Sequence, residues 1–174
     1  MLVTKDQATE IFSRNHEIIS KTLAATQNSS EIISPCLITF EPTKDDEMIP
    51  SGVYLVGDMF RPEVPRTVVM KLINELIENN HVVLLISESV KAIYKTLAEH
   101  EAANKKYGQS LANHPNHEDI VMFALYDESH KPLIRFAKID SNRRLLPMDT
   151  PDMDMNLASG DLVPKPSSPK PTIH

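Results

Sequence analysis

The run VYLV at residues 53–56 decides the predicted fold together with the run VVLLI at residues 82–86. Short runs that are apolar on both faces and rich in β-branched residues are typical of buried strands with helices on either side. Between the two runs, apolar residues recur at helical spacing from Val68 to Ile77. A strand, a covering helix and a second strand predict a right-handed βαβ crossover between parallel strands.

The segments around this unit predict one α/β (or α+β) domain over residues 1–139, with a mixed five-stranded sheet and three main helices. Residues 4–25 form an N-terminal amphipathic helix that opens with a capping box at Thr4 and Gln7. Residues 32–40 read as a first strand, which Pro35 either places at the sheet edge or splits at a bulge. The βαβ core spans residues 53–90 and leads directly into the third helix, and residues 120–139 form an antiparallel hairpin.

Composition limits the classes of function. The chain has 174 residues, of which 41% are apolar, so one well-buried core is the default expectation. A net charge of −6 argues against binding to a nucleic-acid backbone, which needs clustered Lys and Arg. The single cysteine, Cys36, excludes an internal disulfide framework and suits a reducing compartment. No apolar run approaches the roughly 20 residues needed to span a bilayer, so we expect a cytoplasmic protein without a membrane partner.

Residues 140–174 differ in composition and form a predicted proline-rich C-terminal extension. They contain no aromatic residue, and prolines recur at positions 147, 151, 164, 166, 169 and 171. Such a segment buries too little apolar area to fold by itself. It is either a flexible tail or a segment that lies on its own domain or on a partner, and residues 164–171 also have the composition of a polyproline ligand.

Polar side chains follow both core runs. Asp58 and Arg61 come after the first run, and Ser87 and Glu88 come after the second. Because ligands of open α/β sheets gather beyond the carboxyl ends of the strands, these four are candidate ligand-binding residues. The alternative for Ser87 and Glu88 is structural, since both types stabilise a helix N-terminus, where the third helix is predicted to begin.

The densest group of potential metal ligands is HPNHE at residues 114–118. The spacing of His114 and His117 allows two imidazoles to bind one divalent metal, and Glu118 could serve as third ligand or as base. Glu88, His114 and Glu118 are therefore the candidate catalytic set. The alternative is a structural loop, because the proline and the polar surroundings exclude a helical H-E-x-x-H signature. A Ser87–His114 nucleophile pair is a further reading, although no G-x-S-x-G elbow is present.

The order of short motifs resembles a group of uncharacterised bacterial and phage-borne α/β proteins. The motifs are Gly57 with Phe60, Ser87-Glu88, and His114-Pro115 with Glu118, and the resemblance covers roughly residues 53–139. Val90 and His117 depart from it, because the group has an aromatic residue after Ser-Glu and an arginine before the later glutamate. The group has no established activity, so the resemblance supports the fold alone.

Two classes of function remain open from the sequence, and whether the protein is an enzyme is undecided. The first is a small non-catalytic binding or accessory protein with a protein partner or self-association. The second is a small metal-assisted hydrolase with its site at the carboxyl ends of the core strands. The N-terminal helix bears on the first class, since its apolar stripe, which includes Ile11, Phe12 and Ile18, can pack on its own domain or on a second chain.

Overall fold

The computed structural model describes residues 1–26, 33–60, 63–65, 67–92, 94, 96–108, 110 and 113–148. Its helices are α1 (Lys5–Ala25), α2 (Thr67–Glu78) and α3 (Leu97–Tyr107), with a short 3-10 helix η1 (Gly57–Phe60). Its strands are β1 (Cys36–Pro42), β2 (Met48–Leu55), β3 (Val82–Ala92), β4 (His117–Tyr126), β5 (Leu133–Ile139) and β6 (Leu145–Met148). One six-stranded sheet has the order β2-β1-β3-β4-β5-β6, and each of its five ladders is antiparallel.

The predicted crossover exists in a modified form. Strands β2 and β3 are joined through α2 and run in the same direction, because both pair antiparallel with β1, which lies between them. The predicted mixed sheet of five strands is thus an antiparallel sheet of six, and the two crossover strands are parallel to each other but separated by β1. Pro35 precedes β1, and its carbonyl accepts a hydrogen bond from the Val56 N–H at 3.0 Å. The proline therefore does not place β1 at the edge.

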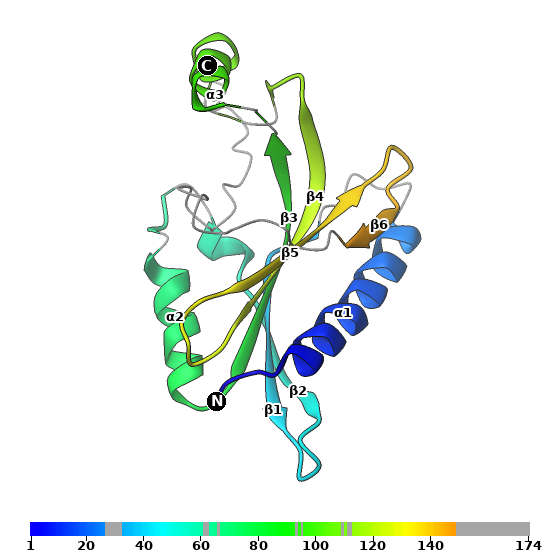
Figure 1. Ribbon diagram of the computed structural model, residues 1–174, viewed down its shortest axis with the longest axis vertical. Helices are drawn as coiled ribbons and strands as arrows, with labels where there is room; N and C mark the ends of the chain where they lie inside the picture. Colours follow the sequence, from blue (N-terminus) through cyan, green and yellow to red (C-terminus); the bar gives the residue numbers. More distant parts are fainter. Residues whose placement is uncertain are drawn as a thin grey trace.

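Two apolar layers hold the sheet between helices, with α1 on one face and α2 on the other (Figure 1). Alternation along β3 explains its unbroken apolar run. Val82, Leu84 and Ile86 pack in the layer on the α1 side, while Val83 and Leu85 pack in the layer on the α2 side. A central strand covered on both faces needs apolar residues at every position.

The apolar stripe of α1 packs on its own domain. Ile11, Phe12 and Leu23 are buried in the α1-side layer. Asn15, which interrupts the stripe, is buried too, and its side-chain amide donates to the Ile11 carbonyl at 2.7 Å. Ile18 is 58% exposed. The capping box is confirmed, because Gln7 N–H donates to Thr4 Oγ1 and Thr4 N–H donates to Gln7 Oε1.

The third helix begins later than predicted. Residues 87–92 continue β3 and pair with β4, with Glu88 opposite Val121 and Ala92 opposite His117. The prediction was wrong because this distant ladder satisfies the backbone groups of residues 87–92. Helix α3 starts at Leu97 behind the N-cap Thr96, and it lies beyond the end of the sheet, away from α1 and α2 (Figure 1).

The sheet extends past residue 139, into the segment predicted to lie outside the domain. A tight turn after β5 is closed by Asp140, whose carboxylate accepts from the N–H groups of Asn142 and Arg144 at 2.8 Å each. Strand β6 follows and pairs with β5. Residues 149–174 lie outside the described residues, and so does the predicted polyproline segment. Among the residues described, no helix is long and apolar enough to cross a membrane.

Candidate functional site

Glu88 forms a structural ion pair. Its side chain is 10% exposed and extends from β3 on the α1 side of the sheet, in step with Ile86. Arg143 Nη1 lies 2.5 Å from Glu88 Oε1, and Arg143 Nη2 lies 3.2 Å from Glu88 Oε2. The N–H of Ile33 donates to Oε2 at 3.0 Å. One carboxylate thus connects β3, the β5–β6 turn and the chain that enters β1.

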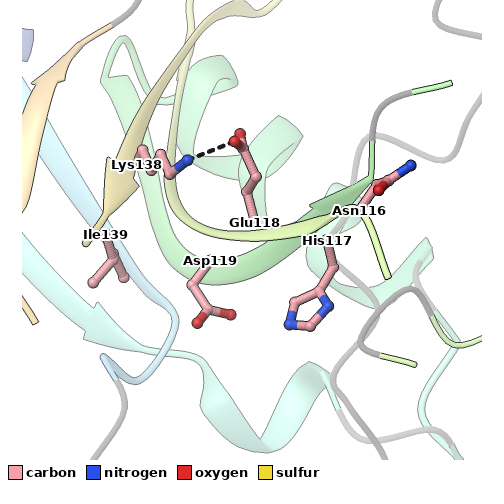
Figure 2. Close-up of a pocket in the computed structure, with 6 residues that line it drawn as sticks. All are labelled: Asn116, His117, Glu118, Asp119, Lys138 and Ile139. Carbon is pink, nitrogen blue, oxygen red and sulfur yellow. Dashed lines mark hydrogen bonds and ion pairs between the residues drawn. The ribbon is translucent and has the colours of Figure 1, made fainter. Parts of the chain in front are cut away.

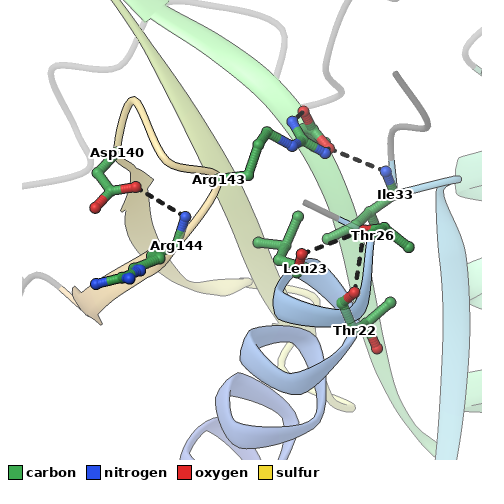
Figure 3. Close-up of polar contacts among 8 residues, drawn as sticks. Thr22, Leu23, Thr26, Ile33, Asp140, Arg143 and Arg144 are labelled. Atoms are coloured by element: carbon green, nitrogen blue, oxygen red, sulfur yellow. Dashed lines mark hydrogen bonds and ion pairs between the residues drawn. The ribbon is translucent and has the colours of Figure 1, made fainter. Parts of the chain in front are cut away.

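Arg143 makes this contact from an unusual backbone conformation. Its φ is 59°, in the left-handed region that residues other than glycine rarely adopt. Figure 3 shows its guanidinium extending away from the turn at Asp140 and Arg144 toward Ile33. The hydrogen bonds to Glu88 raise the pKa of Arg143, and the charge of Asp119 acts in the same direction. Arg143 therefore remains positively charged beside the carboxylates of Glu88 and Asp119.

His114 is fully buried at the base of α3, and both of its ring nitrogens are occupied. Nε2 lies 2.8 Å from the Gly108 carbonyl, so Nε2 carries the proton. Nδ1 therefore accepts a hydrogen bond from the Tyr94 hydroxyl. The ring of Tyr107 also lies against it, with centroids 5.8 Å apart. A metal could bind this imidazole only by displacing one of these protein contacts.

His117 begins β4 and is exposed on the α1 side of the sheet together with Asp119. Its Nδ1 donates to the His114 carbonyl at 2.6 Å, which leaves Nε2 without a partner among the residues the structure describes. His117 and Asp119 line a polar depression at the start of β4 and the end of β5 (Figure 2). Two donors are fewer than the three or four protein ligands of a usual transition-metal site.

Glu118 lies on the opposite face of the sheet. Figure 2 shows it pointing away from His117 and Asp119 and toward Lys138, whose Nζ lies 2.6 Å from Glu118 Oε1. Adjacent residues of a strand point to opposite faces, so Glu118 cannot share a site with Glu88 on the α1 side. No group of three or more His, Cys, Asp or Glu side chains in the described ranges could hold a metal ion. The structure thus brings the His117 ring to the backbone of His114, whose own ring faces Tyr94 and Gly108, and does not bring Glu88 to Glu118.

The other sequence candidates are dispersed. Ser87 is buried on the α2 side of β3, where its Oγ lies 3.4 Å from the Ser89 Oγ. Asp58 is exposed on η1. Arg61 lies outside the described residues. Ser87 and Glu88 point to opposite faces of β3, so they line no common ligand site.

Strand β2 carries an exposed apolar surface that the sequence predictions assigned to the core. Val53 is 64% exposed, Tyr54 is 41% exposed and Leu55 is 81% exposed. The strand lies at the edge of the sheet and contains no Asp, Glu, Lys or Arg. Natural sheets usually protect an edge with charged residues, prolines or bulges. Here Pro50 and the irregularity opposite Thr39/Phe40 protect only the first half of the strand.

The backbone of β2 is open to a further strand. The Val56 N–H donates to the Pro35 carbonyl, toward β1. Alternate residues of an antiparallel strand direct their N–H and C=O groups to the same side, so Tyr54 and Gly52 bond with β1. Val53 and Leu55 therefore direct their backbone groups outward. We call residues 51–55, with these outward groups and the exposed side chains, the β2 edge.

The chain matches no protein-family model, no curated protein and no solved structure. One signal in the sequence could have located the β2 edge: Pro50 lies in the strand itself, whereas Pro35 precedes one. Proline within a sheet is confined to edges, strand starts and bulges.

Proposed function

We propose that this protein is a non-catalytic binding protein and that the β2 edge is its contact surface. The observation that carries the proposal is the exposure of Val53 and Leu55, at 64% and 81%, on an uncharged edge strand. A partner in extended conformation would add a strand there. Its main chain would bond with the outward groups of Val53 and Leu55, and its side chains would cover the two apolar residues.

The contacts of the candidate catalytic residues also support a binding role. Glu88 is engaged by Arg143 and by a backbone N–H, and His114 is engaged through both ring nitrogens. Glu118 is paired with Lys138 on the other face of the sheet. A metal-assisted hydrolase would need these side chains to converge and to have free ligand atoms. The geometry favours a structural role for each of them.

Matched variants of exposed apolar residues test the proposal. Val53→Lys places a charge on the β2 edge, whereas Leu133→Lys places the same charge on β5, at a side chain that is 48% exposed. Proteins recovered from a cell extract with the wild type are purified, and their Kd for wild type and both variants is measured. We expect a loss of at least 10-fold in affinity for Val53→Lys and little change for Leu133→Lys. Equal binding by all three proteins would contradict the proposal.

A further inference from the structure

We infer that the strand that pairs with the β2 edge is the β2 edge of a second copy of this chain. The inference rests on the proposed function and names its partner. Two copies that each carry a net charge of −6 repel each other over most of their surfaces. The β2 edge adds no charge to this repulsion, because residues 48–55 contain no Asp, Glu, Lys or Arg. An uncharged edge strand can pair with another uncharged strand without charge repulsion, and the β2 edge of a second copy is such a strand.

The backbone of the β2 edge is suited to two-fold pairing centred on Val53. Its N–H and C=O groups both point outward, as the direction of the Val56 bond to Pro35 requires. In an antiparallel ladder, two such residues placed opposite each other exchange both hydrogen bonds. A two-fold axis perpendicular to the sheet would then join Val53 of one copy to Val53 of the other. Because Pro50 lies three residues away, the ladder would end before it reaches the residue that cannot donate.

Side chains beside this axis are complementary as well. In the same register, Tyr54 of each copy lies opposite Gly52 of the other. Within one copy a Cβ on Gly52 would lie 3.0 Å from Thr39 Oγ1 and 3.3 Å from Tyr54 Cε2, so this position admits only glycine without adjustment. The Tyr54 ring lies against Gly52 of its own strand, and the glycine opposite it in the paired ladder has no Cβ that could collide with this ring. The pairing would also place the two exposed Val53 side chains against each other on the α1 side.

The oligomeric state of the full chain tests the inference. Size-exclusion chromatography with light scattering is expected to give about twice the monomer mass of 19.6 kDa for the wild type and for Leu133→Lys. Val53→Lys is expected to give the monomer mass, with an unchanged circular-dichroism spectrum as evidence that it folds. A wild-type monomer across the concentration range would overturn the inference, and so would a dimer that Val53→Lys leaves intact.

Disulfide cross-linking tests the register. In a Cys36→Ser background, Val53→Cys would place two thiols on directly opposed residues, within the Cα separation that a disulfide spans. Ile49→Cys is the control, since this exposed residue lies near the far end of β2 and would not face its copy. We expect a covalent dimer for Val53→Cys only, and equal yields from both variants would overturn the pairing. If the wild type is a monomer and another protein binds in a Val53-dependent manner, the proposed function stands and the self-pairing falls.

Discussion

Glu88 and Arg143 connect two parts of the chain that are 55 residues apart. The contact is bidentate, with separations of 2.5 and 3.2 Å, and the carboxylate also holds the Ile33 N–H. Both side chains are largely withdrawn from water, at 10% and 24% exposed. Glu88 thus stabilises the β5–β6 turn and the entry to β1 at the same time.

Replacing Glu88 is expected to destabilise the fold. Glu88→Gln would leave Arg143 without its carboxylate, and the loss should be about 2 kcal/mol, below the range for fully buried pairs because Arg143 retains some solvent contact. The measurement is chemical denaturation. Glu10→Gln is the control, because its pair with Arg14 is exposed and should matter by less than about 0.5 kcal/mol. A double-mutant cycle with Arg143→Gln should show coupling, and purely additive effects would argue against the contact.

The Tyr94 hydroxyl is expected to stabilise the region around α3. Tyr94→Phe removes the donor to His114 Nδ1 and leaves a buried nitrogen unpaired, which costs about 1–2 kcal/mol. Tyr107→Phe is the matched control, because its ring contacts His114 while its hydroxyl bonds to no group in the described ranges. Denaturation of both variants gives the comparison. Equal stability of the two would contradict the hydrogen bond between Tyr94 and His114.

We expect the docking of the N-terminus to depend on pH through Asp127. Burial acts to raise the pKa of Asp127, but hydrogen bonds from Ser129 and from the Val3 N–H outweigh it and hold the pKa below its usual value. A lowered folded-state pKa adds stability above the unfolded pKa of about 3.9, and this stability is lost as the pH falls through the folded-state value.

Asp127→Asn should therefore lower the free energy of unfolding by about 1 kcal/mol at pH 7. The difference from wild type should shrink below about pH 4, where the wild-type carboxyl also becomes protonated. Denaturation at several pH values measures it, with the loop variant Asp45→Asn as control. A difference that is constant with pH would show that the carboxylate charge is not involved.

Local features of the fold could be predicted from the sequence. The capping box at Thr4, the covering helix α2 and the buried β3 depend on short-range patterns, and the structure has each of them. Asn80 follows the end of α2 with a φ of 64°, a left-handed conformation that asparagine tolerates. Such signals depend on residues within one or two helical turns of each other.

The order of the strands could not be predicted, since it depends on distant pairing. The run at residues 53–56 looks like the run at residues 82–86, yet β1 lies between the two strands and leaves β2 at the edge. The candidate site failed for the same reason. Glu88 has a partner from the turn after β5, and alternation along β4 places Glu118 on the opposite face from His117. The Glu88–Arg143 pair has no signal near Glu88 in the sequence, and the alternation of His117 and Glu118 was missed because these residues were assigned to a loop and not to the start of β4.

Residue-resolved hydrogen exchange of the Val53 and Leu55 amides tests the β2 edge most directly. Their N–H groups point away from β1, so only a strand added to the β2 edge can protect them, whereas the Tyr54 amide is bonded within the sheet. In the wild type, under conditions in which it self-associates or binds a partner, we expect the Val53 and Leu55 amides to exchange slowly. In Val53→Lys we expect the Leu55 amide to exchange rapidly. Rapid exchange of both amides in the bound wild type would contradict the account.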